Sequence, residues 1–117
     1  VGFASLGQLR YLSALQYVDM MVGNSSSGLL EAPSFNIATI DIGDRQKGRI
    51  KADSIISCLP TQESIGNAFY KIYSEDFQNI VNNTKNPYGN GGASKIVVDI
   101  IKNYNLNGIL KKTFYDL

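Results

Sequence analysis

The sequence contains no histidine, no tryptophan and only one cysteine among its 117 residues. Without histidine, no Ser/His or Cys/His nucleophile pair can form within the chain, and the usual imidazole ligands of transition metals are absent. The single Cys58 cannot form an internal disulfide, and the apolar run around it predicts a small core residue. We therefore expect no metal site in this chain.

Strong net charge and long apolar runs are also lacking. Eleven basic residues against ten acidic ones give a net charge of +1, which provides no overall field for nucleic acid or an anionic membrane. No run approaches the roughly 20 apolar residues that span a bilayer, and no signal-peptide pattern opens the chain. We expect a cytoplasmic protein that binds neither nucleic acid nor membrane, in which any phosphate binding is local.

The composition is that of a folded domain. The chain is 44% hydrophobic and 18% charged, close to the average of globular proteins. Its length allows one core. Because it begins at Val1 rather than at methionine, we expect a piece of a longer protein.

Hydrophobic patterns predict strands that alternate with helices. A capping box of Ser5 and Gln8 predicts a helix to about Tyr17, and the apolar run that ends at Val22 predicts a buried parallel strand. A serine-rich turn and a short helix to Asn36 follow. Further strands are predicted at 37–42 and 54–59, and further helices at 60–73, 77–81 and 94–104, with a loop at 82–92 and Ser94 as a cap.

This alternation predicts an α/β fold, a Rossmann-like parallel sheet with flanking helices. The apolar positions of the last helix form one stripe, from Ile96 to Tyr104. A complete doubly wound sheet usually has about five or six strands, so we expect preceding βα units to be missing here.

The turn Gly23–Gly28 is a candidate phosphate site. Ligands of open α/β sheets bind outside the carboxyl ends of the strands, where a helix start offers unpaired N–H groups to anions. The hydroxyls of Ser25, Ser26 and Ser27 add donors. The alternative is a serine-rich turn with an ordinary helix cap.

Four further residues are candidates, two of them in a loop at the same edge of the sheet. Glu31, in the helix after the turn, can accept hydrogen bonds from the vicinal hydroxyls of a ribose; alternatively it only stabilises the helix start. Arg45 and Arg49, in the loop that begins at Gly43, can bind phosphate oxygens, or the loop is simply solvated. Tyr11 can stack on a nucleobase, or pack on its helix.

These residues resemble a known family. The segment GNSSSGLLEAPSF, the following strand and GDRQKGR look like the C-terminal domain of the UDP-N-acetylglucosamine 2-epimerases, in the hydrolysing branch that releases N-acetylmannosamine and UDP. The similarity extends to NPYGNGGAS and the closing KKTFYDL. The non-hydrolysing branch shares the Ser…Glu-Ala-Pro helix but normally carries a different segment in place of RQKGR.

The resemblance implies two Rossmann-like domains in the GT-B arrangement, with the substrate in the cleft between them. Residues 1–117 would then be a partial C-terminal nucleotide-sugar-binding domain whose N-terminal partner domain is absent. Carried over by position, the UDP-binding residues would be Tyr11 at the uracil, Glu31 at the ribose, Ser25 and Ser26 at the diphosphate, Arg45 at the nucleotide, and Arg49 beside it.

The family's reaction implies chemistry that this chain does not contain. A proton leaves C2 of the sugar and UDP is lost through a glycal-like intermediate, which is hydrated with inversion at C2. The carboxylates responsible lie mainly in the first domain, and a family histidine lies upstream. We therefore expect no catalytic residue and no cofactor here, an inactive fragment, and a full-length homo-oligomer that uses UDP-N-acetylglucosamine for sialic-acid-type or surface-polysaccharide synthesis.

Two alternatives remain open at this point. A GT-B glycosyltransferase also binds a diphosphate at a helix start and a ribose with a glutamate, and a noncatalytic nucleotide-sugar-binding module needs no further domain. Within the epimerase interpretation, the sugar is either N-acetylglucosamine or a diacetamido-dideoxy relative.

Overall fold

The computed structural model describes residues 1–111 and contains one parallel sheet of three strands. The strands are β1 (Met20–Gly23), β2 (Ala38–Ile42) and β3 (Ile55–Cys58), and they lie in the order β1-β2-β3. Met20 lies opposite Ala38, and Thr39 lies opposite Ile55. The three predicted strands and their parallel arrangement are therefore confirmed. The end of the segment KKTFYDL lies outside the described residues.

Every predicted helix is present, although the segment after the serine turn is split. Pro33, the second residue of its second half, lacks the N–H of a regular helix, which favours a break into two short turns. The helices are α1 (Gly7–Ala14), α2 (Ser27–Leu30), α3 (Gln62–Ile72), α4 (Glu75–Asn82) and α5 (Ala93–Asn103), with 3₁₀ turns η1 (Leu15–Tyr17) and η2 (Ala32–Phe35).

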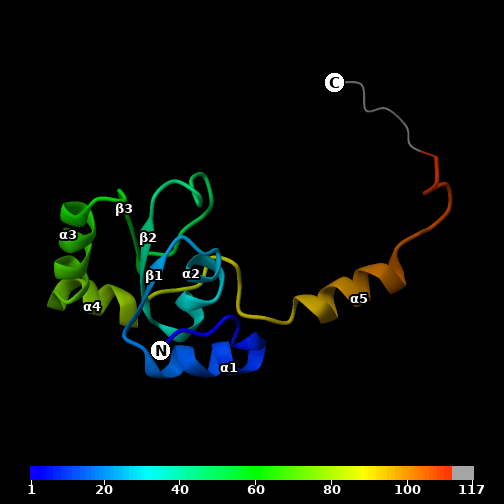
Figure 1. Ribbon diagram of the computed structural model, residues 1–117. Coiled ribbons are helices and arrows are strands. Elements are labelled where there is room, and N and C mark those ends of the chain that lie inside the picture. Colours follow the sequence, from blue (N-terminus) through cyan, green and yellow to red (C-terminus); the bar gives the residue numbers. More distant parts are fainter. Residues whose placement is uncertain (112–117) are drawn as a thin grey trace, which may run out of the picture.

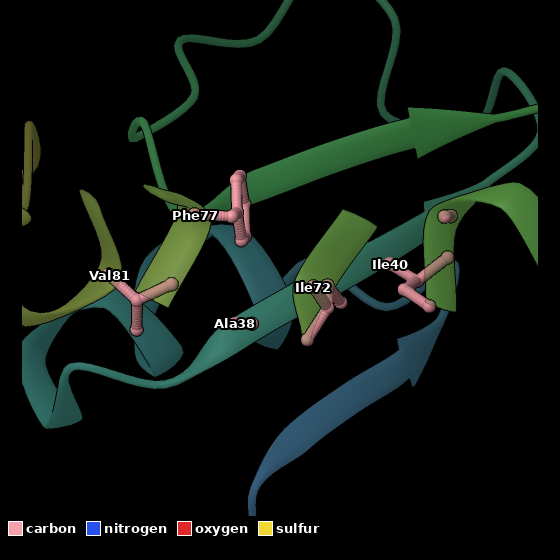
Figure 2. Packing of buried hydrophobic residues seen from close by; sticks show 6 residues of the cluster. Ala38, Ile40, Ile72, Phe77 and Val81 are labelled. Atoms are coloured by element: carbon pink, nitrogen blue, oxygen red, sulfur yellow. The ribbon is translucent and has the colours of Figure 1, made fainter. Parts of the chain in front are cut away.

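The main core lies between β2 and the pair α3–α4 (Figure 1). Side chains alternate along a strand, so Ala38 and Ile40 point to the same face of β2. Figure 2 shows Ile72 from α3, together with Phe77 and Val81 from α4, packed against them. This cluster fixes the helical layer on one face of the sheet.

The other face of the sheet carries α1, η1, α2 and η2. Leu15, Ala32 and Ile37 form a second buried cluster, against which Tyr11 and Met21 pack. The sheet is therefore sandwiched between two helical layers, as expected for a Rossmann-like α/β unit. Both layers rest on β2, of which four of five residues are buried.

Two predicted helix caps are wrong. The first helix begins at Gly7, so the hydroxyl of Ser5 accepts only the Gly7 N–H at 3.2 Å, and no side chain caps the helix. The last helix begins after Gly92, whose left-handed backbone (φ 80°) supplies the turn, and Ser94 is therefore its second residue rather than its cap.

The first strand is less buried than predicted. Val22 is 48% exposed, and β1 pairs with a neighbour on one side only within the described part of the chain. A parallel strand is buried when helices cover both of its faces, and here α3 lies over β2 and β3. The apolar sequence of β1 is thus typical of an inner strand, whereas its position here is at an edge.

Helix α5 projects away from the sheet (Figure 1), and none of its residues is buried. Its apolar stripe, which was predicted from the sequence, is exposed. The radius of gyration is 19.1 Å, compared with about 13 Å for a compact domain of about 100 residues. Among residues 1–111, no helix combines the length and the apolarity that a bilayer crossing requires.

Asn36 joins the two helical layers at one end of the sheet. Its backbone is left-handed (φ 52°), a conformation that asparagine tolerates better than most residues. Its side-chain Nδ2 donates to the carbonyls of Val81 at 3.2 Å and Asn82 at 3.0 Å, at the end of α4. Carbonyls in the last turn of a helix lack the N–H four residues further on, so the amide supplies a donor for them.

We predict that Asn36→Asp lowers the free energy of unfolding by about 1–3 kcal/mol, because a carboxylate cannot donate to two carbonyl oxygens and repels them. Asn36→Gly keeps the left-handed backbone and loses only the two hydrogen bonds, so its loss should be smaller. Urea unfolding measures both, with Asn67→Asp on an exposed position of α3 as the control. Equal stability of Asn36→Asp and wild type would contradict this role.

Candidate functional site

The carboxyl ends of β1 and β2 each lead into a loop that carries candidate residues. The turn at 23–28, here called the serine turn, follows β1, and the loop at 43–54, here called the basic loop, follows β2. The two strands are parallel neighbours, with Gly23 opposite Asp41, so both loops begin at the same edge of the sheet. Their expected proximity is confirmed, and this edge is where ligands bind in open α/β sheets.

The side chain of Gln46 joins the two loops. It is only 2% exposed, and its Nε2 donates to the carbonyl oxygen of Asn24 at 2.8 Å. A buried amide with such a bond holds the basic loop against the serine turn. The sequence analysis missed Gln46, because a glutamine between Arg45 and Lys47 carries no local signal that separates it from a solvated residue.

The serine turn leaves backbone donors free. Gly28 N–H donates to the carbonyl of Ser25 at 3.2 Å and Leu29 N–H to that of Ser26 at 3.0 Å. The N–H groups of Ser25 and Ser26 have no hydrogen-bond acceptor within residues 1–111. Ser25 is exposed and Ser26 is half-buried. Ser25 lines a hollow of about 230 Å³ with Gly23, Asn24, Gly28 and Thr39.

Gly28 sets the distance between α2 and the sheet. A Cβ at this position would lie 2.6 Å from the Cγ2 of Thr39, closer than packed atoms approach. The Oγ1 of Thr39 donates to the carbonyl of Gly28 at 3.0 Å, which fixes the contact from the strand side. A glycine is therefore required for the turn to lie this close to β2.

Glu31 and Tyr11 line a second hollow, of about 660 Å³. The Oε2 of Glu31 is buried and has no hydrogen-bond partner among the described residues. The hydroxyl of Tyr11 contacts the Oγ of Ser27 and donates to the Sδ of Met21 at 3.3 Å. Tyr11 thus packs against the second core cluster and also borders the hollow, so the packing alternative describes part of its role.

The two arginines differ in their relation to the turn. Arg45 lines a third hollow, of about 430 Å³, which shares Gly23 and Asn24 with the hollow of Ser25. Arg49 is exposed further along the loop, and its guanidinium forms no ion pair or hydrogen bond within the described part of the chain. The structure brings Arg45 to the serine turn and does not bring Arg49 there.

A partly buried ion pair anchors the far end of the basic loop. The carboxylate of Asp41 is 1% exposed and lies 2.8 Å from the Nζ of Lys51, which also donates to the Oγ of Ser57 at 2.6 Å. Burial raises the pKa of the neighbouring Cys58 thiol, and the negative charge of Asp41 raises it further. Cys58 is half-buried against the α3–α4 core, as the sequence predicted in part.

Comparison with known proteins identifies a family model that matches residues 2–102, and its description is UDP-N-acetylglucosamine 2-epimerase. The GDP/UDP-N,N'-diacetylbacillosamine 2-epimerase (hydrolyzing) of Campylobacter jejuni is 44% identical over 116 residues, which cover 98% of this chain and 30% of that protein. The polysialic acid biosynthesis protein P7 of Escherichia coli is 39% identical over 111 residues, 92% of this chain and 28% of that protein.

A shorter similarity links the chain to the UDP-N-acetylglucosamine 2-epimerase of Neisseria meningitidis, which is 41% identical over 56 residues. These residues cover 48% of this chain and 15% of that protein. The chain spans at most 30% of the length of the relatives that match it over nearly its whole extent.

We predict that Gly28→Ala destabilises the protein by about 1–3 kcal/mol, because its methyl group overpacks a closely packed contact. The double variant Gly28→Ala with Thr39→Ser removes the clashing Cγ2 and keeps the hydroxyl, so it should recover most of the loss. Thermal unfolding of the two variants, and of Thr39→Ser alone, measures the coupling. Additive effects of the two substitutions would contradict the contact.

We predict that Gln46→Glu loosens the basic loop in a pH-dependent way. An ionised glutamate side chain at this position cannot donate to Asn24, and burial raises its pKa, so the neutral acid is favoured in the folded state. The stability deficit relative to wild type should therefore grow as pH rises above about 4.3, the usual pKa of glutamate. Urea unfolding at several pH values measures this deficit, and a deficit that does not vary with pH would contradict the buried hydrogen bond.

Proposed function

This chain belongs to the UDP-N-acetylglucosamine 2-epimerase family, and we propose that it is the UDP-binding part of a hydrolysing 2-epimerase. The observation that carries the proposal is the hydrogen bond between Gln46 and Asn24, which joins the loop of Arg45 to the turn of Ser25. The names of two relatives support the reaction class, because both are 2-epimerases and one of them is hydrolysing. Family membership favours this activity over that of a glycosyltransferase.

The diphosphate of UDP would bind at the serine turn. The free N–H groups and hydroxyls of Ser25 and Ser26 are donors for phosphate oxygens. Helix α2 has only four residues, so these local donors matter more than a helix dipole. Arg45 would supply the opposing charge across the shared wall of the two hollows. Arg49 would add a second, more distant cation.

The nucleoside would occupy the hollow of Tyr11 and Glu31. A buried carboxylate oxygen without a partner costs free energy, which a hydroxyl donor removes. The two vicinal hydroxyls of a ribose are such donors, and they suit the Oε2 of Glu31. The ring of Tyr11, half-buried in the same wall, would pack on the uracil.

The sugar and the chemistry would belong to the rest of a longer protein. In the proposed GT-B arrangement, this chain is part of the C-terminal domain, and the free edge of β1 would pair with a further strand of the same sheet. The other domain would supply the acid and base that remove the C2 proton and release UDP. The chain by itself would bind nucleotide without turnover, and the whole protein would act in the cytoplasm as a homo-oligomer.

The proposed separation of nucleotide binding from sugar binding also bears on which sugar the substrate carries. The relatives' names differ in the sugar, N-acetylglucosamine in one and diacetylbacillosamine in another, and both include UDP. A nucleotide-binding domain that relatives share, combined with a sugar-binding domain that varies among them, would account for this difference. We propose UDP-N-acetylglucosamine, converted to N-acetylmannosamine and UDP for sialic-acid-type or surface-polysaccharide synthesis, as the reaction of the whole protein.

We predict that Glu31→Gln and Arg45→Ala each weaken UDP binding by about tenfold to a hundredfold, the equivalent of about 1.5–3 kcal/mol for a hydrogen bond to a charged group. Calorimetric titration with UDP measures the dissociation constants. Glu63→Gln on α3 and Lys95→Ala on α5 are matched controls, because both side chains are exposed on other elements.

A coupled UDP-release assay with UDP-N-acetylglucosamine completes the test. We expect no turnover by residues 1–117 and turnover by the full-length protein. Unchanged UDP affinity in both site variants would refute the assignment of the site, and turnover by this chain alone would refute the proposed division between the domains.

A further inference from the structure

The segment Asn86–Tyr88, here called the strap, lies between α4 and α5 and bonds to residues that adjoin Glu31 and Arg49 in the chain. In Figure 1 the chain passes beside α2 on its way to α5. The two side chains of the strap reach residues that are distant in sequence, 56 positions away for Asn86 with Leu30 and 38 for Tyr88 with Ile50. The strap therefore connects the end of α2 with the basic loop.

Asn86 holds the end of α2. Its side-chain Nδ2 donates to the carbonyl oxygen of Leu30 at 2.8 Å and to the Oγ of Ser34 at 2.7 Å. Leu30 is the last residue of α2 and immediately precedes Glu31. The amide thus ties the peptide group that joins Leu30 to Glu31, and with it the backbone from which the proposed ribose ligand extends.

Tyr88 holds the basic loop. Its hydroxyl donates to the carbonyl oxygen of Ile50 at 2.9 Å. Ile50 follows Arg49, and Lys51, on its other side, is bound to the buried Asp41. The loop between β2 and the strap contact is therefore held at Gln46 by the serine turn and at Ile50 by Tyr88.

The strap is itself stiff. The backbone N–H of Tyr88 donates to the Oδ1 of Asn86 at 2.9 Å, so the Asn86 amide uses both its donor and its acceptor atoms. Gly89 N–H donates to the Asn86 carbonyl at 3.2 Å. Pro87 has a fixed φ and restricts the conformation of Asn86 before it. A stiff segment transmits position, because its two ends cannot move independently.

We propose that Asn86 and Tyr88 are positioning residues of the UDP site. Asn86 positions Glu31 for its contact with the ribose, and Tyr88 positions the basic loop for its contact with the phosphates. This inference rests on the proposed function. In the proposed site neither Asn86 nor Tyr88 touches the nucleotide, and each acts through the backbone that it holds.

The two residues should affect different parts of the ligand. Asn86→Ala should reduce the preference for UDP over 2′-deoxy-UDP, because Glu31 is the group that senses the ribose hydroxyls. Tyr88→Phe removes one hydroxyl and should reduce the preference for UDP over UMP, because the basic loop would bind the second phosphate. Tyr88→Phe removes one hydrogen bond, and Asn86→Ala removes three, of which the one to Leu30 holds the backbone before Glu31. Loss of that one bond in each variant, about 0.5–1.5 kcal/mol, corresponds to about twofold to tenfold in each ratio.

The experiment titrates the protein calorimetrically with UDP, 2′-deoxy-UDP and UMP. It compares wild type, Asn86→Ala and Tyr88→Phe, with Glu31→Gln as the reference for lost ribose recognition. Asn67→Ala and Tyr70→Phe, both exposed on α3, are matched controls that should behave as wild type. Rescue by the conservative Asn86→Gln, whose amide is one methylene longer, and thermal unfolding of every variant complete the set.

Selective loss of the ribose preference in Asn86→Ala and of the second-phosphate preference in Tyr88→Phe supports the inference. Equal weakening of all three ligands with a lowered melting temperature indicates a merely structural role and overturns it, and so do unchanged ratios. If the wild-type protein binds UDP, 2′-deoxy-UDP and UMP equally well, the proposed function itself is refuted. If wild type and Glu31→Gln differ as expected but the strap variants match wild type, only the positioning role fails.

Discussion

The central strand β2 is buried on both faces, and this constraint positions everything else in the molecule. Ala38 and Ile40 pack against α3 and α4, so the opposite face is left to Thr39 and Asp41. Thr39 bonds the serine-turn helix, and Asp41 bonds the end of the basic loop through Lys51. One strand thus carries a fully apolar contact on one side and, on the other, the polar contacts that hold both loops of the site.

Buried side-chain polar atoms without hydrogen-bond partners occur in the segment between β1 and β3. Such atoms among the described residues are Glu31 Oε2, Asp41 Oδ1, Gln46 Oε1 and Ser54 Oγ, and all four lie in or beside the two loops. Unpaired buried polar atoms are uncommon in proteins and call for water or a ligand. Of the four, Glu31 Oε2 belongs to a residue that lines a hollow, which it shares with Tyr11, and a hydroxyl donor there would satisfy it.

Local patterns were sufficient for the fold but not for the contacts that organise the site. Strand and helix positions follow from hydrophobic periodicity, and adjacency of the two loops follows from parallel strand order alone. Gln46, Lys51, Asn86 and Tyr88 were invisible because each is defined by a partner more than five residues away in sequence. The capping errors at Ser5 and Ser94 have a different cause, because α1 begins at Gly7 and α5 begins directly after Gly92.

The central claim is that the serine turn and the basic loop form one nucleotide site. The most direct measurement is a UDP titration followed by the backbone amide NMR spectrum of the protein. The account predicts that the amide signals of Ser25, Ser26, Glu31 and Arg45 shift together along one binding curve, while those of α3 and α5 stay in place. Shifts confined to one of the two loops, or curves with different midpoints for the two, would contradict it.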